Sequence, residues 1–136
     1  MATISQLMTR NLSVISEDAR IQDAAKLMHA KRIGSLLVKN HEDFFGIVTE
    51  TDVVRAVAEQ LEEIARLTVR EVMSKPIITV DHTMSPHYAR DLMADRKIRH
   101  LGVTEEGKII GIISVRDLLA YFKTVSKDLQ TSEEHG

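Results

Sequence analysis

Hydrophobic and polar positions follow the same order twice along the chain. A short apolar stretch comes first, LSVI at residues 12–15 and IITV at residues 77–80, and a polar turn follows each stretch. Beyond the first turn, Ile21, Ala24 and Met28 recur at the spacing of one helical face. The pattern therefore predicts a strand and then an amphipathic helix at the start of each copy.

The second copy carries its own helix-start signal. Ser85 stands in the capping position and Pro86 in the first helical position, where a proline is well tolerated. Two strands and another helix are predicted next in both copies. The strands are expected at residues 35–39, 44–49, 100–104 and 108–114, with polar turns inside each pair that are typical of hairpins.

The last helix of each copy is predicted to begin after Thr49 and after Ser114. We expect these helices to bury apolar side chains, namely Val53, Val54 and Val57 in the first copy and Leu118, Leu119 and Phe122 in the second. The element order is then β-α-β-β-α, twice. This order predicts an α/β fold.

The chain is an internal repeat. Shifting it by 65 positions aligns residues 8–59 with residues 73–124 without a gap, and ten of the 52 pairs are identical. Most identical pairs are apolar, as a shared core geometry requires. Two pairs are not, Gly46 with Gly111 and Asp52 with Asp117. Either a close backbone approach or a strand bulge explains the glycines.

One repeat of about 60 residues buries little apolar area on its own. We therefore predict repeats at 1–64 and 65–124 that pack sheet to sheet about a pseudo-twofold axis. Residues 61–73 are expected to form a helical connector, and residues 125–136 a frayed polar tail. Such packing leaves two equivalent clefts, each rimmed by strand ends and a helix N-terminus, where small ligands bind in α/β proteins.

Composition narrows the function classes. Apolar residues make up 43% of the chain and charged residues 28%, which is typical of a globular protein. No apolar stretch approaches the roughly 20 residues of a membrane span, and no signal peptide is recognisable. Without cysteine there is no disulfide, thiol nucleophile or cysteine zinc site, and the cytoplasm is the default location. The net charge of −2 argues against a general nucleic-acid binder.

The motifs TETD and SVRD, at residues 49–52 and 114–117, have two readings. A hydroxyl at the N-cap with an acid three residues later is a capping box, which needs no ligand. A helix N-terminus beside a hydroxyl is also an anion site, and a carboxylate one turn in can accept both hydroxyls of a ribose. In that reading Thr49 and Ser114 face phosphate, and Asp52 and Asp117 face the sugar.

The doubled unit resembles a known family. Its copies end in GIVTETDVV and GIISVRDLL, and KIRHLGV and MSKPIITV are also similar to family segments. Over residues 3–124 the chain resembles a pair of cystathionine-β-synthase (CBS) domains, a Bateman module. The resemblance implies binding of an adenine nucleotide or a related adenosyl ligand in the clefts between repeats. It also implies regulation of an attached domain or partner rather than catalysis.

The resemblance also implies the site residues. One cleft would combine first-copy residues with the second motif: Ser13, Ile33, Gly34, Ser114, Arg116 and Asp117. The other would combine the first motif with second-copy residues: Thr49, Asp52, Ile78, Ile98, Arg99 and His100. Ile33 and Ile98 would sandwich the base, and the cations would meet phosphate. The chain departs from the family at Leu37 and Gly102, where proline is frequent.

Other residues suggest no second chemistry. The six histidines show no metal-ligand spacing, and no nucleophile, base and acid form a set, so we expect neither a metal nor an enzyme. We expect a regulatory module for AMP, ADP, ATP, NAD or S-adenosylmethionine, with AMP first, that signals to a separate protein. The alternatives are a dimerisation or docking module with empty clefts and, after it, a nucleic-acid binder using the basic DRKIRH segment at residues 95–100.

We also expect a homodimer, because the helices carry more apolar surface than one pair of sheets covers. The residues expected to form the dimer surface are Leu61, Ile64, Leu67, Val69, Leu118, Leu119 and Phe122.

Overall fold

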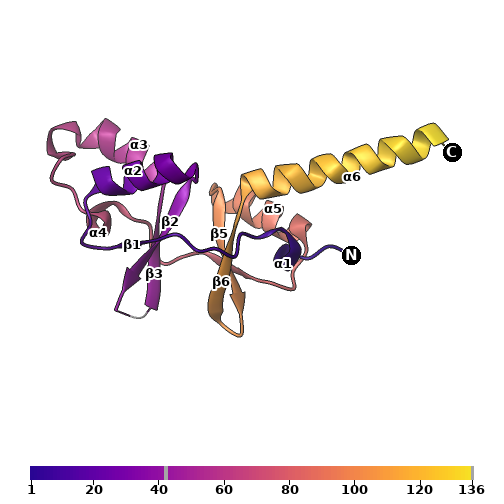
Figure 1. Cartoon of the computed structure of the whole chain (residues 1–136), viewed down its shortest axis with the longest axis horizontal. Coiled ribbons are helices and arrows are strands. Elements are labelled where there is room, and N and C mark those ends of the chain that lie inside the picture. Colours follow the sequence, from indigo (N-terminus) through magenta and orange to yellow (C-terminus); the bar gives the residue numbers. More distant parts are fainter. Residues whose placement is uncertain (42, 136) are drawn as a thin grey trace. The chain divides into compact units, whose positions relative to one another are not determined.

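The computed structural model describes residues 1–41 and 43–135, and side chains as far as residue 127. The chain divides into two compact units (Figure 1). The first-repeat unit comprises Asn11–Ile78, and the second-repeat unit comprises Met1–Arg10 together with the chain from Thr79 onward. Each has one three-stranded sheet with helices packed on it, so the predicted α/β fold with two repeats is confirmed.

The first-repeat unit follows the predicted element order and then adds two short helices. Its elements are β1 (Val14–Ser16), α2 (Ile21–Lys31), β2 (Ser35–Asn40), β3 (Asp43–Thr49), α3 (Glu50–Glu59), the 3-10 helix η1 (Leu61–Glu63) and α4 (Val69–Val72).

The second-repeat unit begins with a short helix from the start of the chain. Its elements are α1 (Ile4–Leu7), β4 (Thr79–Asp81), α5 (Pro86–Arg96), β5 (His100–Glu105), β6 (Lys108–Ser114) and α6 (Val115–His135). Ser85 caps α5 by accepting a hydrogen bond from the Tyr88 N–H at 3.2 Å, and Pro86 follows it, as predicted.

Both sheets have the same topology. β1 pairs parallel to β2 and β2 antiparallel to β3, and β4, β5 and β6 repeat this arrangement. In the first sheet Leu37 of β2 lies between Val14 and Ile47. Because each third strand leads directly into a helix, the N-termini of α3 and α6 lie at equivalent ends of the two sheets.

Each unit is completed by the short helix that belongs to the other repeat in sequence. The segment after α1 pairs with β6, where the Thr9 and Ile112 backbones exchange hydrogen bonds of 2.8 and 3.0 Å. The segment after α4 pairs with β3, where Ser74 and Ile47 exchange bonds of 2.8 and 2.9 Å. The spatial units therefore differ from the sequence repeats in their short first helix.

The predicted helical face of the first copy forms core. Ile21, Ala24 and Met28 are at most 5% exposed and pack with Val38 and Val48 of the sheet. On the surface of this unit the Arg70 guanidinium links α4 to the β1–α2 turn, because it forms salt bridges with Glu17 at 2.7 Å and Asp18 at 2.6 Å. The apolar spacing of the first copy thus placed its core helix correctly.

Gly46 and Gly111 satisfy both explanations offered for them. A register shift follows Val38 in the β2–β3 pairing and Val103 in the β5–β6 pairing, next to each glycine's partner. A Cβ on Gly46 would lie 2.7 Å from Met73 Sδ, and a Cβ on Gly111 would lie 2.5 Å from Met8 Sδ. The glycines are needed because a methionine from the exchanged short helix segment packs on each bulged strand.

Two secondary-structure predictions were wrong. Residues 61–73 are not one helix: η1 is followed by turns and by the four-residue α4, which starts its own capping box at Thr68 with Glu71. The segment from Ser126 onward, expected to fray, continues α6 as far as His135. Of the helices in the described part of the chain, none has both the length and the apolar character needed to cross a bilayer.

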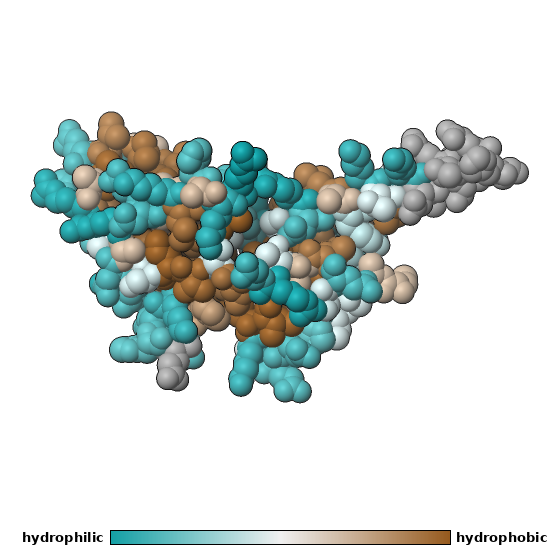
Figure 2. Space-filling view, in the orientation of Figure 1, coloured by the Kyte–Doolittle hydropathy of each residue, from teal (hydrophilic) through white to brown (hydrophobic). Residues whose placement is uncertain are grey.

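The burial predicted for the last helices was also wrong in part. Val54, Val57 and Leu119 are 67%, 43% and 65% exposed. Conversely, three residues of the expected dimer surface are buried in the core of their own units: Leu67, Val69 and Leu118. In the first-repeat unit the exposed large apolar residues are Val14 of β1, Val54 and Val57 of α3 and Leu61 of η1, and Figure 2 shows apolar surface over α3.

Candidate functional site

The aspartate of the first motif is bound into a capping box at the start of α3. Asp52 Oδ2 accepts hydrogen bonds from the Thr49 N–H at 2.9 Å and from the Thr49 hydroxyl at 3.1 Å. In return the Asp52 N–H donates to Thr49 Oγ1 at 3.3 Å. The predicted capping reading is therefore confirmed for this motif.

The second motif has the same box at the start of α6. Asp117 Oδ2 accepts from the Ser114 N–H at 2.8 Å and from the Ser114 hydroxyl at 3.0 Å, and the Asp117 N–H donates to Ser114 Oγ at 3.2 Å. In both motifs the box uses one carboxylate oxygen only. Capping therefore leaves the second oxygen, Oδ1, for another partner.

The two Oδ1 atoms differ. Asp52 Oδ1 accepts from Arg55 Nη2 at 2.8 Å and from the Ser74 hydroxyl at 3.0 Å, and Asp52 is only 2% exposed. Asp117 is half-buried, and within the described residues of its own unit no hydrogen bond reaches its Oδ1. Both oxygens of Asp52 therefore accept hydrogen bonds from its own unit, whereas for Asp117 the described residues of its unit bond to Oδ2 only.

The sequence explains this difference. By the 65-residue shift, Arg55 corresponds to Ala120, which has no donor in its side chain. Ser74 corresponds to Thr9, which keeps a side-chain hydroxyl and pairs with β6 through its backbone as Ser74 pairs with β3. The repeat thus preserves both capping boxes and a hydroxyl residue after each short helix, and it changes the arginine that reaches the outer oxygen of Asp52.

The residue directly before β2 or β5 also meets each helix start. The Glu50 N–H donates to the Gly34 carbonyl at 3.1 Å, and the Val115 N–H donates to the Arg99 carbonyl at 2.9 Å. These carbonyls occupy one of the free donors of each helix N-terminus. Gly34 therefore lies beside the Asp52 motif, and Arg99 beside the Asp117 motif, within their own units.

The predicted site residues divide equally between the units. The first-repeat unit holds Ser13, Ile33, Gly34, Thr49, Asp52 and Ile78, and the second-repeat unit holds Ile98, Arg99, His100, Ser114, Arg116 and Asp117. Ile33 and Ile98 are half-buried, whereas the side chains of Arg99 and Arg116 are exposed. Ser13 Oγ accepts from Lys31 Nζ at 3.3 Å, and its carbonyl accepts from the Leu37 N–H.

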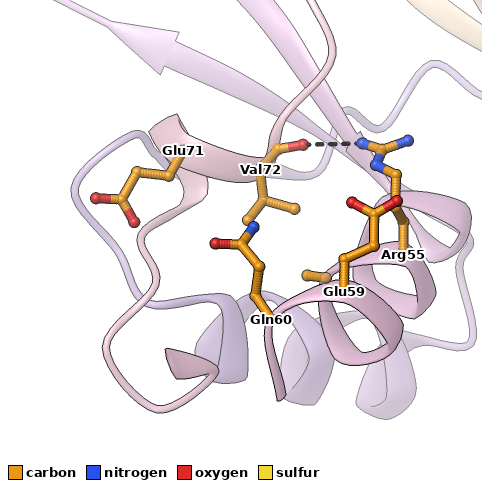
Figure 3. A pocket seen from close by; sticks show the side chains of 6 residues that line it. Arg55, Glu59, Gln60, Glu71 and Val72 are labelled. Atoms are coloured by element: carbon orange, nitrogen blue, oxygen red, sulfur yellow. Dashed lines mark hydrogen bonds between the residues drawn. The ribbon is translucent and has the colours of Figure 1, made fainter. Parts of the chain in front are cut away.

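A small polar hollow lies on the other side of Arg55. Figure 3 shows the lining residues, with Arg55, Glu59 and Gln60 of α3 and its C-cap on one side and the α4 segment with Glu71 and Val72 on the other, and with Arg55 bonded to the Val72 carbonyl. The hollow measures about 40 Å³. Small-molecule pockets usually measure about 300–1,000 Å³, so this one has room for water and not for a nucleotide.

Sequence reasoning missed Arg55 and Ser74 as partners of Asp52. Arg55 could have been found, because an acid and a base three residues apart on a helix are neighbours. Ser74 carries no such signal, since it lies 22 positions away and meets Asp52 only through the strand pairing of its segment. Among the described residues, no group of three or more histidine, aspartate or glutamate side chains is placed to hold a metal.

Comparison with known proteins agrees with the fold. The CBS domain model matches residues 4–59 and 69–124. Protein MK0525 of Methanopyrus kandleri is 33% identical over 119 residues, which are 86% of this chain and 61% of that protein. The chain therefore spans less than two thirds of that relative.

Solved structures extend the comparison. A CBS-domain protein from Burkholderia ambifaria is 34% identical with a TM-score of 0.84, covering 89% of this chain and 93% of that chain. The CBS domain pair of protein MJ0100, solved with 5′-methylthioadenosine and S-adenosylmethionine, has a TM-score of 0.81 over 91% of this chain and 98% of its own. At 20% identity this second likeness concerns the fold alone.

Proposed function

Because the chain belongs to the CBS-domain family, we propose that it is a regulatory module that binds an adenine nucleotide, with AMP as the first expected ligand. It would signal nucleotide occupancy to a separate protein and catalyse nothing itself. We assign the repeats to residues 1–64 and 65–124, followed by the polar segment 125–136. With no cysteine to protect or pair, we assign the module to the cytoplasm.

The observation that carries this proposal is the second oxygen of Asp117. Its Oδ2 caps α6, and no hydrogen bond from the described part of its unit uses Oδ1. A half-buried carboxylate oxygen of this kind can accept hydrogen bonds from ribose hydroxyls without dismantling the cap. Asp117 can therefore cap α6 with one oxygen and bind a ribose with the other.

The neighbours of Asp117 suit a nucleotide phosphate. Ser114 stands at the N-cap of a long helix, whose first N–H groups favour an anion, and Arg116 adds an exposed cation in the first turn. The adenosyl ligands held by the MJ0100 pair support this assignment at the level of the fold.

The test substitutes Asp117→Asn. Asparagine keeps the shape and still caps a helix, so the melting temperature without ligand should change little. The charged acceptor is lost, and hydrogen bonds to charged groups are worth about 1.5–3 kcal/mol, so AMP should stabilise the variant far less than the wild type. 2′-Deoxy-AMP on the wild type should mimic the substitution.

Asp91→Asn serves as the control, because it removes one carboxylate charge from an exposed position of α5, where Asp91 pairs with Arg90. At a hundredfold excess of AMP over its Kd, the wild type and this control should gain about 2.7 kcal/mol. Equal gains for Asp117→Asn and the wild type would defeat ribose binding and leave Asp117 as a helix cap only.

A second candidate function, dimerisation or partner docking, is favoured by one observation. Val54, Val57 and Leu61 are 67%, 43% and 65% exposed in one stretch of the first-repeat unit. Such apolar stretches mark interaction surfaces, and we propose that a second copy of the chain covers this one. Light scattering should give about 31 kDa, twice the 15.3 kDa of one chain, and Val54→Asp should give the monomer. A wild-type monomer at micromolar concentration would contradict the homodimer.

A further inference from the structure

The two copies of the motif differ in the hydrogen-bond partners of one aspartate oxygen, Oδ1, which is the oxygen that a ribose hydroxyl would bond. In each copy Oδ2 of the aspartate is committed to the capping box, at 2.8–3.1 Å from both donors of the N-cap residue. Only Oδ1 is left to receive a sugar hydroxyl. In the first copy that oxygen already has two donors, Arg55 and Ser74.

Arg55 is held in this role at two points. Its Nη2 donates to Asp52 Oδ1 at 2.8 Å and to the Val72 carbonyl at 3.4 Å (Figure 3). The Asp52 side chain is 3% exposed, and that of Arg55 is 47% exposed. The guanidinium therefore covers the buried carboxylate from the solvent side, while its outer face remains in water.

A neutral hydroxyl competes poorly with such a partner. Charge-assisted hydrogen bonds are roughly twice as strong as neutral ones, and a buried carboxylate that loses its cation is left poorly compensated. A ribose that displaced Arg55 would gain two neutral donors and lose a charged one. We expect the affinity at Asp52 to fall by at least about tenfold relative to an open carboxylate.

We propose that Arg55 is a built-in occupant of the Asp52 site, so that each chain binds one adenine nucleotide, at Asp117, instead of two. This inference rests on the proposed nucleotide binding and adds to it the residue that decides which copy is open. Ser74 supports Arg55 by donating to the same oxygen. The corresponding position in the second copy is Ala120, which leaves Asp117 uncovered.

Because the two copies are equivalent in sequence, an arginine like Arg55 can be introduced at the corresponding position of the second copy. Ala120→Arg places a guanidinium three residues after Asp117, on an exposed helical position where arginine is well tolerated. AMP binding, measured by calorimetry, should weaken at least about tenfold. Ala120→Gln is the matched control, because it has a side chain of intermediate length without charge, and it should bind AMP like the wild type.

The reciprocal variant is Arg55→Met, which keeps the apolar stem and removes the guanidinium. The wild type should bind one AMP per chain and this variant two. Arg66→Met is its control, because Arg66 is exposed and its nearest carboxylate, on Glu63, lies 3.9 Å away. In the double variant Arg55→Met with Asp117→Asn, one site should remain, now at Asp52.

Each result has a distinct meaning. Two equal AMP sites in the wild type would overturn the role of Arg55 while leaving nucleotide binding intact. Weaker binding in Arg55→Met would also overturn it, since Arg55 would then be a phosphate ligand. No AMP binding in any variant would overturn the proposed function and this inference together. If Arg55→Met melts before assay, Ala120→Arg decides alone: unchanged affinity there would refute occupancy by a guanidinium.

Discussion

Replacing Gly111 by alanine should cost far more stability than replacing Gly46, although the two glycines are equivalent by sequence. A Cβ at position 111 would lie 2.5 Å from Met8 Sδ and 3.0 Å from both Met8 Cγ and the Thr9 carbonyl oxygen. At position 46 the corresponding contacts are 2.7 Å to Met73 Sδ and 3.2 Å to the Ser74 carbonyl oxygen. The difference lies in whether these neighbours can move.

A thioether can move away from a new methyl group more easily than a paired backbone carbonyl. Met8 is 9% exposed and has little room, and the Thr9 carbonyl is held by the Ile112 N–H at 3.0 Å. The Ser74 carbonyl is held equally by the Ile47 N–H at 2.9 Å, but it lies slightly farther from the new Cβ, and Met73 is half-buried and can turn toward solvent. Overpacking costs about 1–3 kcal/mol, and alanine returns about 0.4–1 kcal/mol through the unfolded chain. We expect net losses of about 2 kcal/mol at position 111 and below 1 kcal/mol at position 46.

Urea unfolding followed by circular dichroism measures both losses, and in thermal melts they correspond to about 8 °C and less than 4 °C. Met8→Ala destabilises by itself, but in the double variant it should remove about half of the Gly111→Ala penalty, because the thioether contact disappears and the carbonyl contact stays. The reasoning fails if Gly46→Ala costs as much as Gly111→Ala. It also fails if the losses of unfolding free energy caused by Met8→Ala and by Gly111→Ala simply add in the double variant.

Two further expectations concern single side chains. Lys97, which ends α5, has φ +56° in the left-handed region, so Lys97→Gly should stabilise the protein by about 1 kcal/mol, whereas Lys97→Ala should not. The pKa of Asp81 is lowered from its ordinary value of 3.8 by the Thr83 side-chain hydrogen bond and then by the Thr83 N–H. A lowered carboxyl pKa stabilises the fold above pH 3.8 and loses this effect as the pH falls through the folded pKa, so Thr83→Val should make the acid loss of stability shallower in urea titrations between pH 5 and pH 2.

Local spacing was sufficient to predict the order of the elements and both capping boxes. The box at Thr49 and Asp52 depends on residues three apart, and the hairpins depend on polar turns between apolar runs. The same rule would have found α4, because Thr68 and Glu71 have the spacing of a capping box. Reading residues 61–73 as one helix overlooked that signal, which marks the start of a new helix inside the segment.

The burial of the last helices could not be predicted from apolar residues alone. Asp52 is 2% exposed and Ala56 is 3% exposed, so the buried face of α3 passes through these two positions, one turn apart. Val54 lies about 200° around the helix from Asp52 and therefore faces solvent. The aspartate sets this face because its capping box holds it against the sheet end. Counting apolar residues assigned Val54 and Val57 to the core together with Val53, and of these three only Val53 packs against it.

An equivalent motif does not make an equivalent site, and the two aspartates illustrate why. The residues that make a capping box come from one helix start and repeat with the sequence. The residues that reach the outer carboxylate oxygen come from the next turn and from an exchanged segment, and the arginine of the next turn is not preserved in the repeat. Extending one site assignment to both copies therefore assumes an equivalence that Arg55 and Ala120 break. With Asp52 closed by its own arginine, occupancy of a single Asp117 site follows a simple hyperbola within each chain. Any steeper response to nucleotide would then have to arise between chains and not between the two copies of the motif.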